Sequence, residues 1–201
     1  MNTSLPERSA ACGFWTSEFI YVYGGQVESV EGGKIHNEWY KIDVTADSAE
    51  VWLKPTITGR HSSTCIYSSN EGIAIVYGGA SSTGVEEDTI VYNLASNTFA
   101  IQDTTNAPKA RMMHSAALHN GSMYVFGGIE PGNVISNTLV ALDLDIWCWR
   151  DVSSFDVEGQ PMKMAGHVSA ATDGQILVFG GMNLESMQLY SNVFVFSIEE
   201  A

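Results

Sequence analysis

The sequence is poor in cysteine and has no long apolar run. Its 201 residues include 3 cysteines, Cys12, Cys65 and Cys148, which lie far apart and form no CxxC pair. Disulfide scaffolds and zinc sites use denser cysteine patterns, so we expect free, mostly buried thiols in a reducing compartment. No apolar run approaches the roughly 20 residues of a membrane helix, so no membrane segment is expected. The opening MNTSLPERSA lacks a basic head followed by an apolar stretch, which predicts no signal peptide and favours the cytoplasm.

Basic residues are also scarce. Lys and Arg number 9 while Asp and Glu number 23, which gives a formal net charge of −14. Such a surface would repel the backbone of a nucleic acid, and the basic residues do not cluster, so nucleic-acid binding is not expected. An acidic excess mainly keeps a protein soluble, although a protein partner with a basic patch would also suit it.

Glycine pairs are the strongest positive signal in the sequence. Four of them each close an apolar or aromatic run, and they recur at intervals of roughly fifty residues. Glycine at a strand end permits positive φ and the close approach of another backbone. The runs IYVYGG, AIVYGG, MYVFGG and ILVFGG end in Gly24-Gly25, Gly78-Gly79, Gly127-Gly128 and Gly180-Gly181.

Each glycine pair lies inside a longer shared unit. Upstream, a basic residue or a histidine precedes small residues. Three histidines are assigned to one repeat position: His61, His114 and His167. His61 lies farther from its glycine pair than the other two histidines do, which predicts a lengthened turn at SSNEG. Downstream, a polar residue precedes an alternating strand, and a further short strand follows. We expect the aromatic residues of these last two strands to be buried between adjacent sheets: Trp39, Trp52, Phe99 and Trp149.

Four short β-like runs make up each unit. In the third unit they read HSAALH, SMYVFG, TLVALDL and CWRDV, and the hairpin signal Asn120-Gly121 separates the first two. Four strands per unit at this period are typical of a propeller blade, and no stretch shows a convincing helical period. The pattern therefore predicts an all-β protein.

The double glycines and the downstream aromatic residues resemble the kelch-repeat family, including the kelch-like central domain of galactose oxidase. The resemblance covers nearly the whole chain and implies a single kelch-repeat domain over residues 1–201. In that family the His/Ser strand is innermost, the glycine strand is second and the aromatic strand is outermost. The implied blades are approximately 8–54, 60–103, 111–153 and 166–198.

The number of repeats departs from the family pattern. Kelch propellers usually close with about six or seven blades, within the range known for β-propellers. This chain has four units, and the last stops before its outer strand. We therefore expect an open arc or a fragment of a larger propeller, with self-association through its open blade faces.

Candidate binding residues lie where the chain enters an inner strand. Arg8, Arg60 and Arg111 occupy that place, and in kelch domains that bind peptides such loops line the mouth of the channel. Arginine can hold a carboxylate there through paired hydrogen bonds, although each Arg could instead bridge adjacent blades. His36 and Asn37, at the end of the first variable loop, complete the candidate set. Specificity is expected in the loops between second and third strands: 26–36, 80–87, 129–136 and 182–191.

Residues for catalysis or metal binding do not stand out. His61, His114 and His167 could suggest a metal site, but their recurrence once per repeat predicts a structural role. No GxSxG, HExxH or EF-hand pattern occurs. We therefore predict no catalytic residue, no metal site and no cofactor.

Two functions remain open. The first is a non-catalytic protein–protein interaction module that binds a protein or peptide through loops on one face of the propeller. The alternative is part of a kelch-scaffold enzyme of the oxidase or sugar-epimerase type, which rests on analogy because a fold does not fix a function.

Overall fold

The computed structural model describes residues 5–27, 33–46, 48–53, 55–152 and 162–198. In these ranges every regular element is a β-strand, from β1 to β20, and no helix occurs. The prediction of an all-β protein is confirmed. No described segment is a helix long and apolar enough to cross a membrane.

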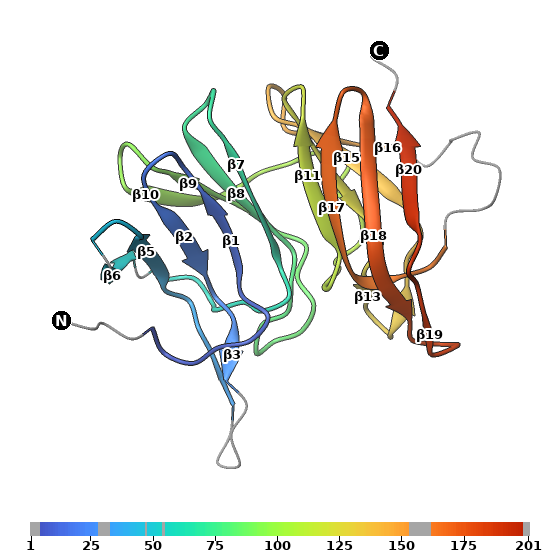
Figure 1. The fold of residues 1–201 in the computed structure, drawn as a ribbon, viewed down its shortest axis with the longest axis horizontal. Coiled ribbons are helices and arrows are strands. Elements are labelled where there is room, and N and C mark those ends of the chain that lie inside the picture. Colours follow the sequence, from blue (N-terminus) through green and yellow to red (C-terminus); the bar gives the residue numbers. More distant parts are fainter. Residues whose placement is uncertain (1–4, 28–32, 47, 54, 153–161, 199–201) are drawn as a thin grey trace.

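Four antiparallel sheets follow one another along the chain and form blades 1 to 4 (Figure 1). Blade 1 consists of β1 (Cys12–Trp15), β2 (Ile20–Tyr23), β5 (Trp39–Asp43) and β6 (Ser48–Leu53). Blade 2 consists of β7 (Thr64–Ser68), β8 (Ile73–Tyr77), β9 (Thr89–Asn93) and β10 (Thr98–Gln102). Blade 3 consists of β11 (Ser115–His119), β12 (Ser122–Phe126), β15 (Leu139–Asp143) and β16 (Cys148–Asp151).

Blade 4 differs from the others because no long outer strand occurs among its described residues. Its strands are β17 (Ala165–Thr172), β18 (Gln175–Asn183) and β20 (Val193–Ser197), and the short β19 (Gln188–Leu189) pairs with the end of β18.

Small hairpins follow the glycine pairs at one end of the blades. They are β3 (Gln26–Val27) with β4 (Lys34–Ile35), and β13 (Ile129–Glu130) with β14 (Val134–Ile135). Together with β19 and the equivalent loop 80–87, they lie on one side of the molecule, the lower side in Figure 1. We call this side the Gly-Gly face.

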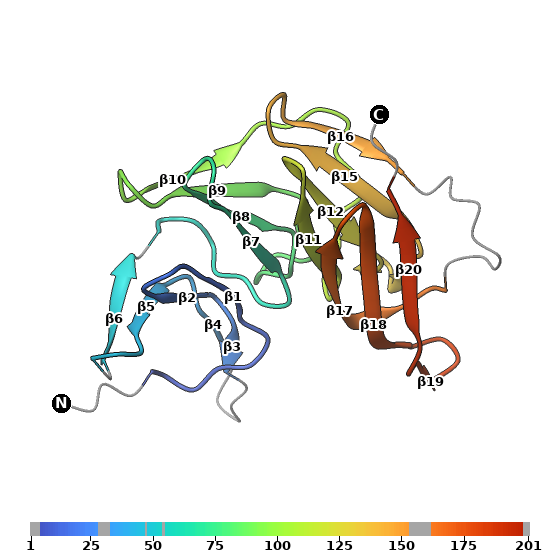
Figure 2. The same ribbon diagram turned by 45° about the horizontal axis from the view of Figure 1, so that its top comes forward.

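The inner strands pack against each other in chain order, β1 on β7, β7 on β11 and β11 on β17. Figure 2 shows the four blades in an arc, with blade 1 and blade 4 at its two ends. The four-blade β-propeller arrangement and the open arc agree with the prediction.

Three apolar clusters fill the spaces between neighbouring blades. Trp39 lies between blades 1 and 2 with 1% of its surface exposed, and Trp149 lies between blades 2 and 3 with 2% exposed. Trp52 and Phe99 are half-buried at the edge of the cluster between blades 1 and 2. The expected burial is thus nearly complete for Trp39 and Trp149 and partial for Trp52 and Phe99, although Trp149, like the last two, lies on an outer strand.

The cysteine prediction was wrong. Cys12 of β1 and Cys65 of β7 form a disulfide, with their Cα atoms 5.5 Å apart, and Cys148 is the free cysteine among the described residues. The two residues lie on neighbouring inner strands, so blade packing brings together thiols that the sequence separates widely. Their separation of 53 residues is about one repeat, which is why the two cysteines lie on inner strands of neighbouring blades.

Candidate functional site

Arg60 joins blade 1 to blade 2 on the Gly-Gly face. Its backbone N–H donates to His36 O (3.1 Å) and its carbonyl accepts from Gly25 N (2.7 Å), both in blade 1. Its side chain turns to blade 2, where Nη1 donates to Gly78 O (3.1 Å) and Nη2 lies 2.6 Å from Asp88 Oδ2. With 3% of its surface exposed, Arg60 is enclosed by these partners.

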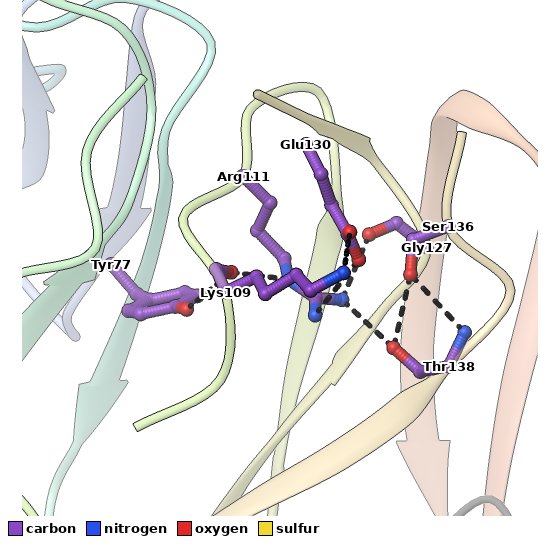
Figure 3. A network of polar contacts seen from close by, with 7 residues as sticks. All are labelled: Tyr77, Lys109, Arg111, Gly127, Glu130, Ser136 and Thr138. Atoms are coloured by element: carbon purple, nitrogen blue, oxygen red, sulfur yellow. Dashed lines mark hydrogen bonds and ion pairs between the residues drawn. The ribbon is translucent and has the colours of Figure 1, made fainter. Parts of the chain in front are cut away.

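Arg111 makes the same connection between blades 2 and 3. Its carbonyl accepts from Gly79 N (2.9 Å), and its Nη1 donates to Gly127 O (3.1 Å). Figure 3 shows the Arg111 and Lys109 side chains converging on Glu130, with N–O distances of 3.8 Å and 3.3 Å. Arg111 is 2% exposed, so this guanidinium is also enclosed by the protein.

Hydroxyl groups complete the network around Arg111. Thr138 Oγ1 accepts from Arg111 Nη1 at 3.3 Å and lies 3.0 Å from Ser136 Oγ (Figure 3). The Tyr77 hydroxyl donates to Lys109 O at 3.5 Å. Blade 2 therefore contacts this network through Tyr77, and blade 3 supplies the hydroxyl and carboxylate acceptors.

At the two ends of the arc, the residue at the arginine position or its contacts differ from those of Arg60 and Arg111. In blade 1, Arg8 Nη1 donates to Gly24 O (2.8 Å) and the guanidinium lies 4.5 Å from the Tyr40 ring centroid. In blade 4 the equivalent residue is Met164, whose carbonyl accepts from Gly128 N (2.9 Å). The backbone contact between blades is thus kept without an arginine, which shows that the main chain carries the junction.

His36 and Asn37 lie beside the first junction. His36 is 3% exposed, and its Nδ1 lies 3.1 Å from Glu38 Oε2. Burial alone would raise the pKa of Glu38, but hydrogen bonds from its own backbone and from His36, with the charge of Lys34, lower this pKa below its ordinary value. Asn37 Nδ2 donates to Pro55 O at 2.9 Å. Both candidates therefore hold the loop that leads from blade 1 to blade 2.

The histidine register differs from the prediction at His61. The Cβ atoms of Ser63, His114 and His167 lie against the second glycine of their own blades, so Ser63 occupies the histidine position of blade 2. His61 pairs with Ala80 as Met112 pairs with Ile129, two positions earlier in the repeat. The turn between β7 and β8 is longer than Asn120-Gly121, as predicted, but it accounts for only part of the shift.

His114 and His167 each reach the preceding blade. His114 Nε2 lies 2.9 Å from Thr64 Oγ1, and His167 Nε2 donates to Phe126 O at 3.1 Å. Burial, with the nearby charge of Arg111, lowers the pKa of His114 to about 3, and burial lowers the pKa of His167 to about 4. Both imidazoles are therefore neutral near pH 7 and act as structural contacts between blades.

A small cavity of about 210 Å³ lies where the inner strands of the four blades converge. Its lining includes the Cys12–Cys65 disulfide, the two inner histidines and the serines beside them. Within the described ranges, no group of three or more His, Cys, Asp or Glu side chains could hold a metal ion.

The basic side chains described on the Gly-Gly face already have partners within the chain. The exposed Lys34, Lys109 and Lys163 each form an ion pair with a glutamate, at N–O distances of 3.6, 3.3 and 3.6 Å. Glu185, the partner of Lys163, is exposed, and so is Glu87 on the same face. The cations described on this face are thus paired, and Glu87 is an exposed carboxylate in no ion pair among the described residues.

Sequence reasoning missed the acidic partners of the buried arginines, Asp88 and Glu130, and the substitution of Met164 for arginine. One signal was available: Asp88 is the polar residue that precedes the third strand of its unit. Arg60 and Arg111 lie at blade junctions on the Gly-Gly face, with His36 and Asn37 beside the first of them, whereas Arg8 contacts blade 1 alone. The structure therefore does not bring these residues together into one group. Their contact with a ligand stays a prediction.

The repeated sheets and their glycine junctions define a β-propeller built from equivalent blades. A family model described as the KLHDC2/KLHL20/DRC7 Kelch-repeats domain matches residues 10–201. The chain belongs to the kelch-repeat family, whose propellers are commonly protein-interaction modules.

Several known proteins are similar to the chain. Adagio-like protein 3 of Oryza sativa subsp. japonica is 32% identical over 165 residues, which cover 78% of this chain and 26% of that protein. Host cell factor of Drosophila melanogaster is 27% identical over 194 residues, covering 82% and 13%. Kelch domain-containing protein 1 of Mus musculus is 33% identical over 82 residues, covering 41% and 20%. The chain thus spans about a quarter or less of these relatives.

A solved structure has the same fold. The structure of YjhT superposes with a TM-score of 0.69 at 14% identity, covering 87% of this chain and 59% of that chain. This likeness concerns the fold alone, and it supports the assignment of the four sheets as propeller blades.

Proposed function

We propose that the chain is a non-catalytic protein-binding module that recognises a basic protein segment through its Gly-Gly face. One observation carries the proposal: every basic side chain described on this face has a partner within the chain, while the exposed Glu87 forms no ion pair with a described residue. Loops on a rigid scaffold in a chain of net charge −14 favour a partner of opposite charge.

The candidate arginines have an indirect part in this proposal. Arg60 and Arg111 hold the loops between blades, and Arg8, His36 and Asn37 hold the first loop. Because these side chains are fixed by internal partners, the loops beside them present their carboxylates in a constant arrangement. Such preorganisation reduces the entropy lost when a partner binds.

A display library of random peptides provides the test. We expect the wild-type protein to enrich lysine- and arginine-rich peptides, with binding that weakens as salt rises. Charge reversal by Glu87→Lys with Glu185→Lys should weaken their binding about tenfold or more, or about 1.4 kcal/mol.

The matched control reverses two charges on the opposite face, by Asp145→Lys with Asp173→Lys. Both aspartates are exposed at hairpin turns away from the glycine pairs. This variant has the same net charge as the test variant, so equal loss of binding in both would show a general charge effect and reject a site on the Gly-Gly face. Enrichment of acidic or neutral peptides would also reject the proposal.

A further inference from the structure

The disulfide joins two neighbouring blades through their inner strands, β1 and β7, which lie side by side (Figure 1). Cys12 pairs with Tyr23, the residue directly before the glycine pair of blade 1. Cys65 pairs with Val76, which lies two residues before the first glycine of blade 2. The S–S bond therefore crosses from one sheet to the next and does not link strands within one blade.

The same pair of positions recurs between the later blades without cysteine. By the register of the sheets, Thr64 of blade 2 and Ala116 of blade 3 occupy these positions at the next junction. Ser115 of blade 3 and Ser169 of blade 4 occupy them at the last junction. The inner strands pack together at all three junctions. The disulfide is thus added to a contact that the repeat also makes without one.

Other contacts hold blade 1 against blade 2. The rings of Trp39 and Tyr92 lie 5.5 Å apart in the apolar cluster between these blades. Near the inner strands, Ser62 N donates to Ala10 O at 2.8 Å. Because these contacts do not involve sulfur, we expect both blades to stay folded when the disulfide opens.

Both cysteines can be reached from the small cavity at the centre of the arc. Cys12 and Cys65 are half-buried, and both line this cavity of about 210 Å³. Gly13, which follows Cys12, is exposed and has no side chain to cover the sulfur. Exposed disulfides exchange with thiols more readily than enclosed ones do. The position of this disulfide therefore suits reaction with a small thiol.

One hydrogen bond makes the two sulfur atoms unequal. Ser63 Oγ donates to Cys12 Sγ at 3.6 Å. In the described part of the chain, no comparable donor contacts Cys65 Sγ. A donor beside sulfur stabilises a thiolate, because the thiolate carries the negative charge. Cys12 is therefore the better leaving group, and Cys65 is the sulfur that a thiolate attacks.

We propose that the Cys12–Cys65 disulfide is a site of reversible exchange with a small thiol such as glutathione. The thiolate of the small molecule attacks Cys65 Sγ and forms a mixed disulfide as the bond to Cys12 breaks. The electron pair of the broken bond stays on Cys12 Sγ, where Ser63 stabilises the charge. The link between the inner strands of blades 1 and 2 is then open.

A second molecule of the small thiol completes the reduction. Its thiolate attacks the small-molecule sulfur of the mixed disulfide, and the electron pair leaves on Cys65 Sγ. Two thiols are thereby oxidised to one symmetric disulfide, and the protein disulfide gains two electrons. The two protons released by the small thiols end on Cys12 and Cys65. The reverse sequence closes the bridge again.

Redox titration of the folded 201-residue chain provides the test, in a Cys148→Ser background that removes the free thiol. The protein is equilibrated with mixtures of reduced and oxidised glutathione, quenched in acid, alkylated and analysed by mass spectrometry. We expect the reduced fraction to follow the glutathione ratio and to reach the same value from either direction. Circular dichroism should stay that of the folded protein. The rate should rise in proportion to thiol concentration, and the mixed disulfide should map to Cys65.

A serine variant tests the asymmetry. Ser63→Ala should slow the reduction of the folded protein by about threefold, because the leaving thiolate loses its donor. Ser96→Ala, at an exposed position in the β9–β10 turn, is the matched control and should react like the parent. Peptide binding to the Gly-Gly face enters neither measurement, so this proposal and the proposed function can fail separately.

Three outcomes would overturn the proposal. Neither glutathione nor the uncharged 2-mercaptoethanol could reduce the disulfide until urea unfolds the chain, which would make the bridge purely structural. The rate could become independent of thiol concentration, which would show that unfolding must come first. The mixed disulfide could form mainly on Cys12, against the assigned leaving group. The titration of the parent protein decides the matter even if Ser63→Ala is unstable.

Discussion

The guanidinium of Arg60 and the carboxylate of Asp88 lie 2.6 Å apart within blade 2, while the backbone of Arg60 is bonded to blade 1. One residue therefore connects the loop of one blade to the third strand of the next. Arg111 repeats the arrangement one blade further along, with Glu130 as its carboxylate partner. The junctions of the Gly-Gly face thus combine main-chain hydrogen bonds with ion pairs of the buried arginines.

Replacing Arg60 by Met should lower the free energy of unfolding by about 2–4 kcal/mol, because Asp88 and Gly78 O lose their shared donor. Arg60→Lys should restore only part of the loss, since an ammonium group cannot match the fork of a guanidinium. Urea unfolding measures both. Arg150→Met, at an exposed position, is the control and should cost less than about 1 kcal/mol. An equal loss at both positions would contradict the junction role.

Trp149→Ala should cost roughly 3–5 kcal/mol, the range for removing a core aromatic side chain. Trp149 is 2% exposed between blades 2 and 3, whereas Trp15 is 78% exposed. Trp15→Ala should therefore change stability by less than about 1 kcal/mol. Denaturant melts compare the two, and a loss below about 1 kcal/mol at Trp149 would show that this residue is peripheral.

Gly127→Ala and Gly180→Ala place a methyl group on the same backbone conformation in different surroundings. The first methyl would lie 2.6 Å from Met164 O, and the second meets no described residue within 4 Å. We expect Gly127→Ala to destabilise the monomer by about 1–3 kcal/mol more than Gly180→Ala. Unfolding at low protein concentration measures the difference. Equal costs would mean that strain from positive φ dominates at both sites.

Stability should fall as the pH drops below about 6.5. In the folded protein burial lowers the pKa of His114 to about 3 and of His167 to about 4, from an ordinary value of 6.5. Between pH 6.5 and each lowered pKa, the unfolded chain binds more protons than the folded one. The free energy of unfolding should therefore fall by roughly 1 kcal/mol per pH unit for each histidine as the pH drops. Urea unfolding between pH 7 and 5 should show this slope. A His114→Gln, His167→Gln double variant should have a flatter profile, and parallel profiles would refute the assignment.

Loss of the Cys12–Cys65 disulfide should lower the free energy of unfolding by about 2–4 kcal/mol, because the bridge restricts the unfolded chain. Replacing both cysteines by Ser should reproduce the effect of a reducing agent on the wild type. Cys148→Ser should leave that effect unchanged, since Cys148 is free. Thiol titration of the denatured, unreduced protein should detect one reactive group. Three groups before reduction would show that the disulfide does not form.

The repeat could be predicted from the sequence because its determinants are local. Gly127 and Gly128 end an alternating strand, and Asn120-Gly121 forms the preceding hairpin, so the four strands of blade 3 follow from turn chemistry and period. The histidine register of blade 2 did not follow. His61 lies two positions before the histidine position of the repeat. Only the contact of Ser63 with Gly79 shows that Ser63 occupies this position in blade 2.

By itself the sequence determined the all-β class, the four blades and the glycines at their junctions, since strand alternation and positive φ act within a few residues. Only the tertiary structure decided the Cys12–Cys65 bridge, the Arg60–Asp88 pair and the replacement of arginine by Met164, because each joins segments from different strands or blades. The exposure of Phe179 beside Gly180 likewise depends on where blade 4 lies in the arc.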